Sequence, residues 1–359
     1  MARMIPMMPI MDMRSSDRGI ALVMVLWVLM LLSVIVGEFC YSMKTQVNIT
    51  ANYKESTASY YIALAGINNA IYNMVYQTVI PPPADGEGAD EDAVEWRINT
   101  EIPPIDFAGG RVTVWIDNES GRININLADR DLLMFMLSGF ELENEEKEII
   151  VDSILDWRDT DDLRRLHGAE SEYYQSLPQP YSAKNGPFDA GDELLLVRGV
   201  TPEIYYGGLD RMVTVFPKIA PEQTTDRRKP KTETDFNRIN INAVPPAMWA
   251  SLPGMTEDMV AQIIEFRKEK DFRSMSELGE IVGNDVLAGI SRYLNTRPSP
   301  YYTIYATGEK PDSGIYETIA ATIRMDNTIA KRYRIVEWKI GIPLREQTVA
   351  GGEIASEQI

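Results

Sequence analysis

The chain has 359 residues, of which 45% are hydrophobic and 25% are charged. This composition is ordinary for globular domains and excludes a wholly disordered chain or a polytopic membrane protein. The 53 acidic and 35 basic side chains leave a formal charge of −18, which disfavours general binding to nucleic-acid phosphates. A single cysteine excludes an internal disulfide, and a single histidine excludes zinc sites that need two or more histidines.

The first 36 residues divide into a polar leader and an apolar segment. Residues 1–19 contain Arg14 and Arg18, whereas residues 20–36 contain no charged side chain. As a helix this segment spans roughly 25 Å, close to the hydrocarbon thickness of a bilayer, and no face of it is polar. Small residues for a signal-peptide cleavage site are poorly represented after it. We therefore expect a membrane-spanning helix whose basic end stays in the cytoplasm.

The helical pattern continues beyond the apolar segment. Residues 47–77 repeat apolar side chains at intervals of three and four, which places them on one helix face. The residues on this face are Tyr61, Leu64, Ala65, Ile71, Tyr72 and Val75. We expect one helix over residues 20–77, apolar on all sides at first and amphipathic later. The prolines at 81–83 end it.

Strand patterns occur near both ends of the remaining chain. Residues 110–117 and 122–127 alternate apolar and polar side chains around a turn, which predicts a hairpin. Three further strands are predicted at residues 301–307, 315–325 and 332–340. A single antiparallel sheet formed from the early and late segments would provide the packing surface for the long helix. The expected fold is α+β, with a large helical insertion between the strands.

The insertion contains an internal repeat. Arg122–Asn126 and Arg238–Asn242 both read RININ, and two helical segments follow each copy. The repeated units resemble SAM-like, or helix-hairpin-helix, modules. Such modules often bind DNA, but in the clearest hairpin, Leu252–Asp258, two carboxylates follow at the phosphate position. We interpret both modules as protein-packing units and expect no nucleic acid partner.

Acidic residues are concentrated between Asp129 and Glu172, where 14 Asp or Glu accompany five Lys or Arg. Carboxylates at alternate positions of a loop can converge on calcium, which takes six to eight oxygen ligands. The spacing is not that of an EF-hand. A solvated acidic helix end explains the composition equally well. We find no nucleophile elbow, phosphate-binding loop or histidine pair that would indicate an enzyme.

The junction Arg18-Gly19-Ile20 resembles the leader of type IV pilins and pseudopilins. In that family a prepilin peptidase cleaves after the glycine and methylates the new amino terminus. The resemblance implies cleavage between Gly19 and Ile20. Most members carry glutamate at the fifth mature position, which here is Met24. The K minor pseudopilins of type II secretion lack that glutamate and contain two inserted modules, and the chain resembles them over most of its length.

This resemblance has several implications. The fold would be pilin-like, and the chain would be a tip subunit in the bacterial inner membrane, single-pass, with its carboxy-terminal domain in the periplasm. Its partners would be the I and J minor pseudopilins and the prepilin peptidase. Calcium, as one or two ions, would bind Asp159, Asp161, Asp162, Glu170 and Glu172, with Asp156 and Asp192 as further candidates. The alternative is a single-pass periplasmic helix-hairpin-helix protein such as a DNA-uptake receptor, which requires no cleavage after Gly19.

The expected domain organisation follows from these elements. A leader, a membrane segment and a pilin-like helix with the first strands precede the first module with its acidic loop. The second module, the remaining strands and a tail follow. The corresponding ranges are 1–19, 20–41, 42–128, 129–236, 237–297, 298–345 and 346–359.

Overall fold

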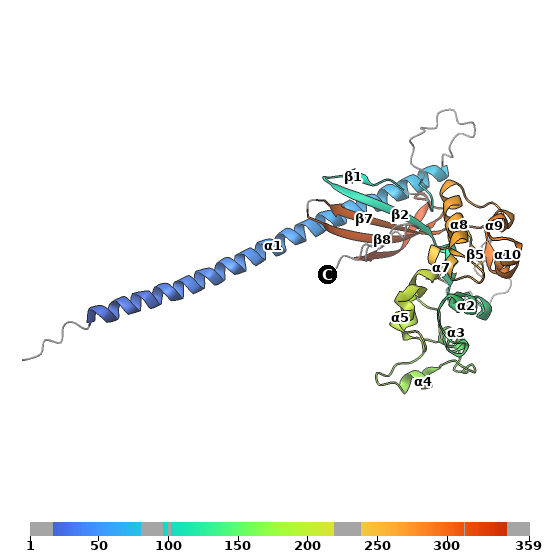
Figure 1. Cartoon of the computed structure of the whole chain (residues 1–359), viewed down its shortest axis with the longest axis horizontal. Coiled ribbons are helices and arrows are strands. Elements are labelled where there is room, and N and C mark those ends of the chain that lie inside the picture. Colours follow the sequence, from blue (N-terminus) through green and yellow to red (C-terminus); the bar gives the residue numbers. More distant parts are fainter. Residues whose placement is uncertain (1–16, 80–95, 100–101, 219–237, 312, 343–359) are drawn as a thin grey trace, which may run out of the picture. The chain divides into compact units, whose positions relative to one another are not determined.

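The computed structural model describes residues 17–79, 96–99, 102–218, 238–311 and 313–342 (Figure 1). The chain divides into two compact units, Met1–Ala58 and Ser59–Ile359. Residues 1–16 of the expected leader and all of the expected tail lie outside the described residues.

The long amino-terminal helix expected from the sequence is present as α1 (Asp17–Val79). Its first part is apolar and exposed; Trp27, for example, is 70% exposed. Within the described residues this is the one helix long and apolar enough to cross a membrane. From Ser59 onward the helix buries one face, which carries Ile62, Ala63, Ile67, Ala70, Ile71 and Met74. The change from an all-apolar to an amphipathic pattern therefore marks the point where packing begins.

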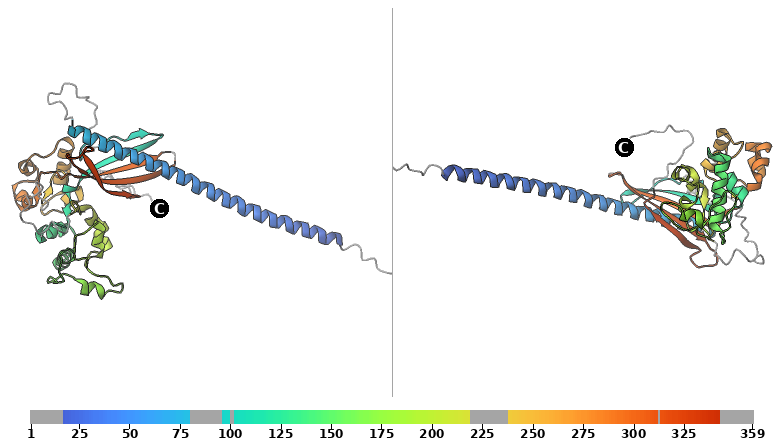
Figure 2. Two further views of the ribbon diagram at one scale, coloured as in Figure 1. Left: turned by 180° about the vertical axis from the view of Figure 1, so that it is seen from behind. Right: turned by 90° about the horizontal axis from the view of Figure 1, so that it is seen from below.

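A five-stranded antiparallel sheet packs on this buried face of α1 (Figure 1 and Figure 2). Its order is β1-β2-β7-β8-β9. The strands are β1 (Ile105–Phe107), β2 (Gly110–Asn118), β7 (Tyr301–Lys310), β8 (Ile315–Met325) and β9 (Tyr333–Ile340). Strand β2, from before the insertion, pairs directly with β7, from after it. The prediction of one sheet from early and late segments is therefore confirmed.

Helix and sheet approach each other closely at Gly308. A Cβ atom there would lie 2.1 Å from the carbonyl oxygen of Ser59 and 2.5 Å from the amide nitrogen of Ala63. Only glycine fits this position without moving the backbone of α1. Around the contact, Val112, Val114, Ile304 and Ile319 belong to the same buried cluster as the apolar face of α1.

The predicted hairpin between residues 110–117 and 122–127 is wrong. After β2 the chain forms a short 3₁₀ helix, η1 (Glu119–Gly121), which Asn118 caps by accepting a hydrogen bond from the amide of Ser120 at 3.0 Å. The RININ segment then leaves the sheet, because both edges of β2 are already paired with β1 and β7. It contributes instead the two-residue strand β3 (Ile123–Asn124).

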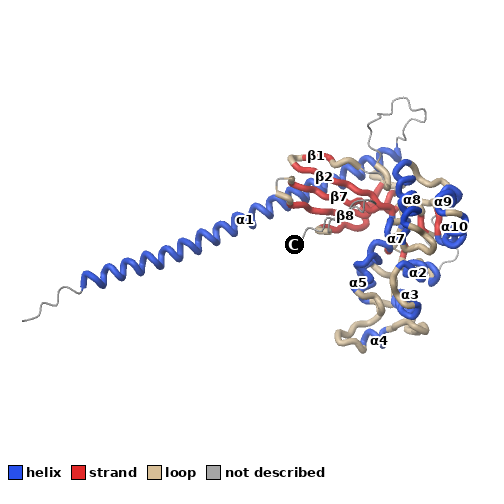
Figure 3. The backbone as a smooth tube through the Cα atoms, in the orientation of Figure 1, coloured by secondary structure: helices blue, strands red, loops and turns tan. Residues whose placement is uncertain are grey.

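Each RININ copy begins a module with its own short parallel ladder. Strand β3 pairs with β4 (Val213–Thr214), and β5 (Ile239–Asn240) pairs with β6 (Leu294–Asn295). Figure 3 shows the long strands confined to the main sheet and short helices filling the modules. The first module contains α2 (Arg130–Met136), η2 (Leu137–Gly139), α3 (Asn144–Arg158), α4 (Ser171–Gln175), η3 (Gly191–Leu196), α5 (Pro202–Ile204), the π-helical turn η4 (Tyr205–Leu209) and α6 (Asp210–Met212). The second contains α7 (Pro246–Ala250), α8 (Glu257–Glu269), α9 (Met275–Val282), α10 (Asn284–Ile290) and η6 (Ser291–Tyr293).

The two modules repeat the same side-chain hydrogen bonds. In the first, the amide of Asn126 donates to the carbonyl of Phe188 at 2.9 Å and accepts from its N–H at 2.7 Å. In the second, Asn242 and Phe272 form the same pair of bonds at 3.0 and 2.8 Å. The internal repeat read from the sequence is therefore a structural repeat.

Candidate functional site

The acidic segment is an insertion within the first module. Arg158 donates to the carbonyl of Ala128, and its counterpart Arg267 donates to the carbonyl of Val244. In the second module only residues 268–271 separate this arginine from Phe272. In the first, residues 159–187 separate Arg158 from Phe188. The first module is therefore longer than the second because of residues 159–187, which we call the acidic loop.

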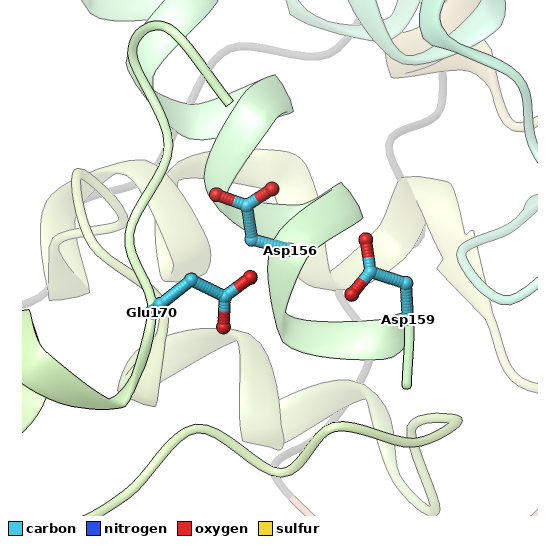
Figure 4. Close-up of side chains that lie close together, drawn as sticks. All are labelled: Asp156, Asp159 and Glu170. Carbon is cyan, nitrogen blue, oxygen red and sulfur yellow. The ribbon is translucent and has the colours of Figure 1, made fainter. Parts of the chain in front are cut away.

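Three carboxylates meet at the base of this loop. Asp156 lies in the last turn of α3, Asp159 caps its carboxy-terminal end, and Glu170 caps the start of α4. Figure 4 shows Glu170 directed from its loop toward the end of α3 that carries the two aspartates. One oxygen from each carboxylate lies within 4.8 Å of the others. Because the negative end of the α3 dipole is also here, the arrangement concentrates negative charge.

Burial makes this charge costly. Asp156 is fully buried and Glu170 is 4% exposed. Neither carboxylate oxygen of Glu170 has a hydrogen-bond partner among the described residues. Burial first, and then the negative charges of Asp156 and Asp159, raise the pKa of Glu170 from 4.5 to about 7. A bound cation would compensate both the burial and the repulsion.

The cation that the protein itself supplies is Arg165. Its Nη1 donates to Oδ1 of Asp156 at 2.5 Å and to Oδ2 of Asp159 at 2.6 Å. Oδ1 of Asp159 nevertheless remains buried without a hydrogen-bond partner among the described residues. Burial still raises the pKa of Asp156, against the lowering by Arg165. When all three carboxylates are ionised, one arginine thus leaves two negative charges uncompensated.

The other four residues that the resemblance implied as calcium ligands lie outside this group. Oδ1 of Asp161 accepts from the amide of Leu163, and Oδ1 of Asp162 accepts from Nδ2 of Asn185, both at 2.9 Å. The negative charges of Asp162 and Asp161 do, however, contribute to raising the pKa of Glu170. Glu172 in α4 and Asp192 in η3 are both exposed.

Besides Arg165, two residues of the site were not anticipated from the sequence. Asn185 holds Asp162 through its Nδ2, and its own Oδ1 is buried without a partner among the described residues. Gly168 lies so close to Asp156 that a Cβ atom would be 1.9 Å from its Oδ2. A glycine followed by alanine inside a charged stretch was the available signal for a close approach. The donor set of carboxylate oxygens, with an amide oxygen nearby, fits a hard cation such as calcium.

We expect Gly168→Ala to destabilise the chain. The added methyl group would collide with a carboxylate that is fully buried and cannot move into solvent, a strain of roughly 1–3 kcal/mol. Thermal unfolding of the detergent-solubilised chain would measure the loss. Gly186→Ala is the matched control, because its nearest heavy atom would lie 3.8 Å away. Equal melting temperatures for the two variants would contradict the close contact.

The raised pKa of Glu170 predicts a pH dependence of stability in the absence of calcium. Between about pH 4.5 and about pH 7 the folded chain holds a proton that the unfolded chain releases. The free energy of unfolding should therefore fall as pH rises through this window. Glu170→Gln removes the titrating group, so the difference in melting temperature between variant and wild type should change across the window. A constant difference would show that Glu170 titrates normally.

The residues predicted for processing and assembly lie together near the start of α1. Gly19 and Ile20 are both within the helix, and Met24 is one turn further on. Ile20 and Met24 are exposed.

A long amino-terminal helix packed on an antiparallel sheet defines a pilin-like protein anchored by a single helix. Residues 118–218 match the family model described as "Type II secretion system (T2SS), protein K". This part of the chain is therefore similar to type II secretion protein K. The matched region covers the end of β2 and the whole of the first module.

Curated proteins of the same description match the chain over longer stretches. The putative type II secretion system protein K of Escherichia coli K12 is 25% identical over 209 residues, 54% of this chain and 61% of that protein. The Aeromonas hydrophila protein K is 22% identical over 275 residues, 68% of this chain and 81% of the relative. A chain in the crystal structure of the GspK-GspI-GspJ complex from enterotoxigenic E. coli has the same fold, with a TM-score of 0.51 and 14% identity. The match covers 84% of this chain and 99% of that one.

Proposed function

We propose that the chain is a minor pseudopilin and the tip subunit of a type II secretion pseudopilus, where it helps to initiate assembly for protein export across the outer membrane. The observation that carries the proposal is the fold match, which extends over 99% of a chain from a GspK-GspI-GspJ complex. The partners proposed by this match are the I and J minor pseudopilins.

The tip position is supported by Met24 and by the insertion. In ordinary subunits a glutamate at the fifth mature position is expected to pair with the amino terminus of the subunit ahead, and an unpaired carboxylate in apolar surroundings is costly. A tip subunit has no subunit ahead, so methionine at this position carries no penalty. The two modules between β2 and β7 add a bulk that would obstruct further subunits above.

The proposal includes membrane location and processing. The apolar segment of α1 would hold the chain in the inner membrane, and the domain that begins at Ser59 would lie in the periplasm. Arg14 and Arg18 support this orientation. A prepilin peptidase would cleave between Gly19 and Ile20 and methylate the new amino terminus.

Calcium is the proposed ligand of the acidic loop. Asp156, Asp159 and Glu170 would hold one ion, because they converge and because the oxygens of Glu170 lack partners among the described residues. The remaining predicted ligands would complete its shell or hold a second ion; they are Asp161, Asp162, Glu172 and Asp192. A bound ion would neutralise the loop and stabilise an insertion built largely without regular structure.

The hairpin that precedes α8 argues against the DNA-uptake alternative. The hydroxyl of Thr256 accepts from the amide of Met259 at 3.3 Å, so one of the first helix amides is already bonded. Glu257 and Asp258 follow in the first turn and are exposed. Negative side chains at this end of a helix repel phosphate.

Coexpression with the I and J subunits of the same secretion system would test the tip assignment. We expect the full chain, extracted in detergent, to form a complex with one copy of each partner, measured by native mass spectrometry. It should form no fibres by itself in electron micrographs. Crosslinks that repeat this chain along a pseudopilus shaft would contradict the tip position and leave the pilin-like fold intact.

A further inference from the structure

Arg165 lies in the position that a cation bound by the acidic loop would need. Its Nη1 contacts Asp156 and Asp159 at 2.5 and 2.6 Å, and its backbone amide donates to Oδ2 of Asp156 at 3.2 Å. The guanidinium of Arg165 therefore contacts two of the three carboxylates that would ligate the ion. Calcium binds oxygen at about 2.3–2.6 Å, so a bound ion and Nη1 would compete for the same oxygens.

The charge at the site favours the ion. When all three are ionised, Asp156, Asp159 and Glu170 carry three negative charges, and Arg165 supplies one positive charge. Both oxygens of Glu170 and one of Asp159 stay buried without hydrogen-bond partners among the described residues. A divalent cation in place of Arg165 would compensate two of the three charges, one more than the arginine does, and would reach all three carboxylates. Ion and guanidinium would also repel each other at this separation.

We infer that Arg165 is an exchangeable counter-cation, which holds the carboxylates together in the ion-free chain and leaves when calcium binds. The inference rests on the calcium site proposed above. Arg165 acts here through the charge and geometry of its guanidinium, and its departure releases Asp156 and Asp159 to ligate the ion.

The surroundings of Arg165 allow it to leave. Its side chain is 39% exposed, and its neighbours Leu163 and Leu166 are 78% and 84% exposed. The segment that carries it is therefore only loosely packed on the module. Arg158 differs, because both of its bonds anchor it to the module: it donates to the carbonyls of Ile125 and Ala128. Arg158 thus has a structural role, whereas Arg165 has a route to solvent.

The experiment compares Arg165→Gln with Arg164→Gln in the full detergent-solubilised chain. Arg164 is the exposed neighbour in the same loop, so its substitution removes an equal charge. We measure the Kd for calcium by titration calorimetry and the melting temperature in chelator and in saturating calcium. Arg165→Gln should tighten calcium binding on the order of tenfold. It should lower the melting temperature in chelator and leave it unchanged in saturating calcium, while Arg164→Gln should change neither value appreciably.

An equal loss of melting temperature with and without calcium would show that Arg165 stays in place, and would overturn the exchange. Unchanged or weaker calcium binding by Arg165→Gln would do the same. If the wild-type chain binds no calcium in the calorimeter, the proposed calcium site fails, whatever the variants do in chelator. Arg165→Lys keeps the charge and preserves the test if Arg165→Gln does not fold. Its melting temperature should be lower than that of the wild type in chelator and equal to it in saturating calcium.

Discussion

Gly19→Leu should abolish processing and leave the full precursor in the membrane. The expected cleavage site lies between the polar leader and the uncharged segment that starts at Ile20, and glycine is the residue preceding the cut. A bulky side chain there would block access of the peptidase to the peptide bond. Intact-mass measurement of the membrane-extracted chain reports the result, because the wild type should begin at Ile20 and carry one added methyl group.

Gly37→Leu is the matched control for this experiment. It makes the same substitution in α1, at a position where an added Cβ would meet nothing within 4 Å. This variant should be processed as the wild type is. A wild-type mature chain that starts anywhere other than Ile20, or a normally processed Gly19→Leu variant, would refute the assignment.

Removal of calcium should lower the melting temperature of the wild-type chain substantially. An ion present at 100 times its Kd stabilises the folded state by about 2.7 kcal/mol. For a unit the size of Ser59–Ile359 that corresponds to roughly 4 °C. Glu170→Gln and Asp159→Asn should each remove most of this difference, because they delete charge from the group that converges in space. Differential scanning fluorimetry with calcium or with chelator measures the effect.

Variants outside the three-residue group sharpen this prediction. Glu280→Gln, on the exposed face of α9, should retain the full calcium response and serves as the control. Glu172→Gln and Asp192→Asn should lose less of the response than Glu170→Gln does, because both side chains are exposed. Identical melting curves for the wild type in calcium and in chelator would mean that the loop is a solvated acidic segment.

The wrongly predicted hairpin shows that local sequence pattern and tertiary structure can disagree about strand pairing. Residues 110–117 and 122–127 both alternate, and a turn lies between them, so local information favours pairing. The structure pairs β2 with β1 and β7 instead. The partner β7 lies beyond the insertion, and no local pattern reveals a contact between such distant segments. The same alternation in RININ buries Ile123 and Ile125 in the core of the first module.

The sequence alone determined the features that depend on local periodicity and composition. It located the helix that becomes α1, the strands β7, β8 and β9, and the repeat marked by RININ. The leader junction at Gly19 stays a prediction. These follow from hydrophobic spacing, which acts within a few residues along the chain. The family resemblance also came from contiguous residues around Gly19 and from the repeated modules.

Only the tertiary structure decided which carboxylates of the acidic loop converge. Asp156 and Asp159 are one helical turn apart, but Glu170 joins them because the loop folds back over Gly168. Arg165 enters the same site for the same reason. A loop of this length can place its charges in many ways, and their final positions depend on closure against α3. The physical reason is that burial and charge compensation are properties of the folded module, which residue spacing does not encode.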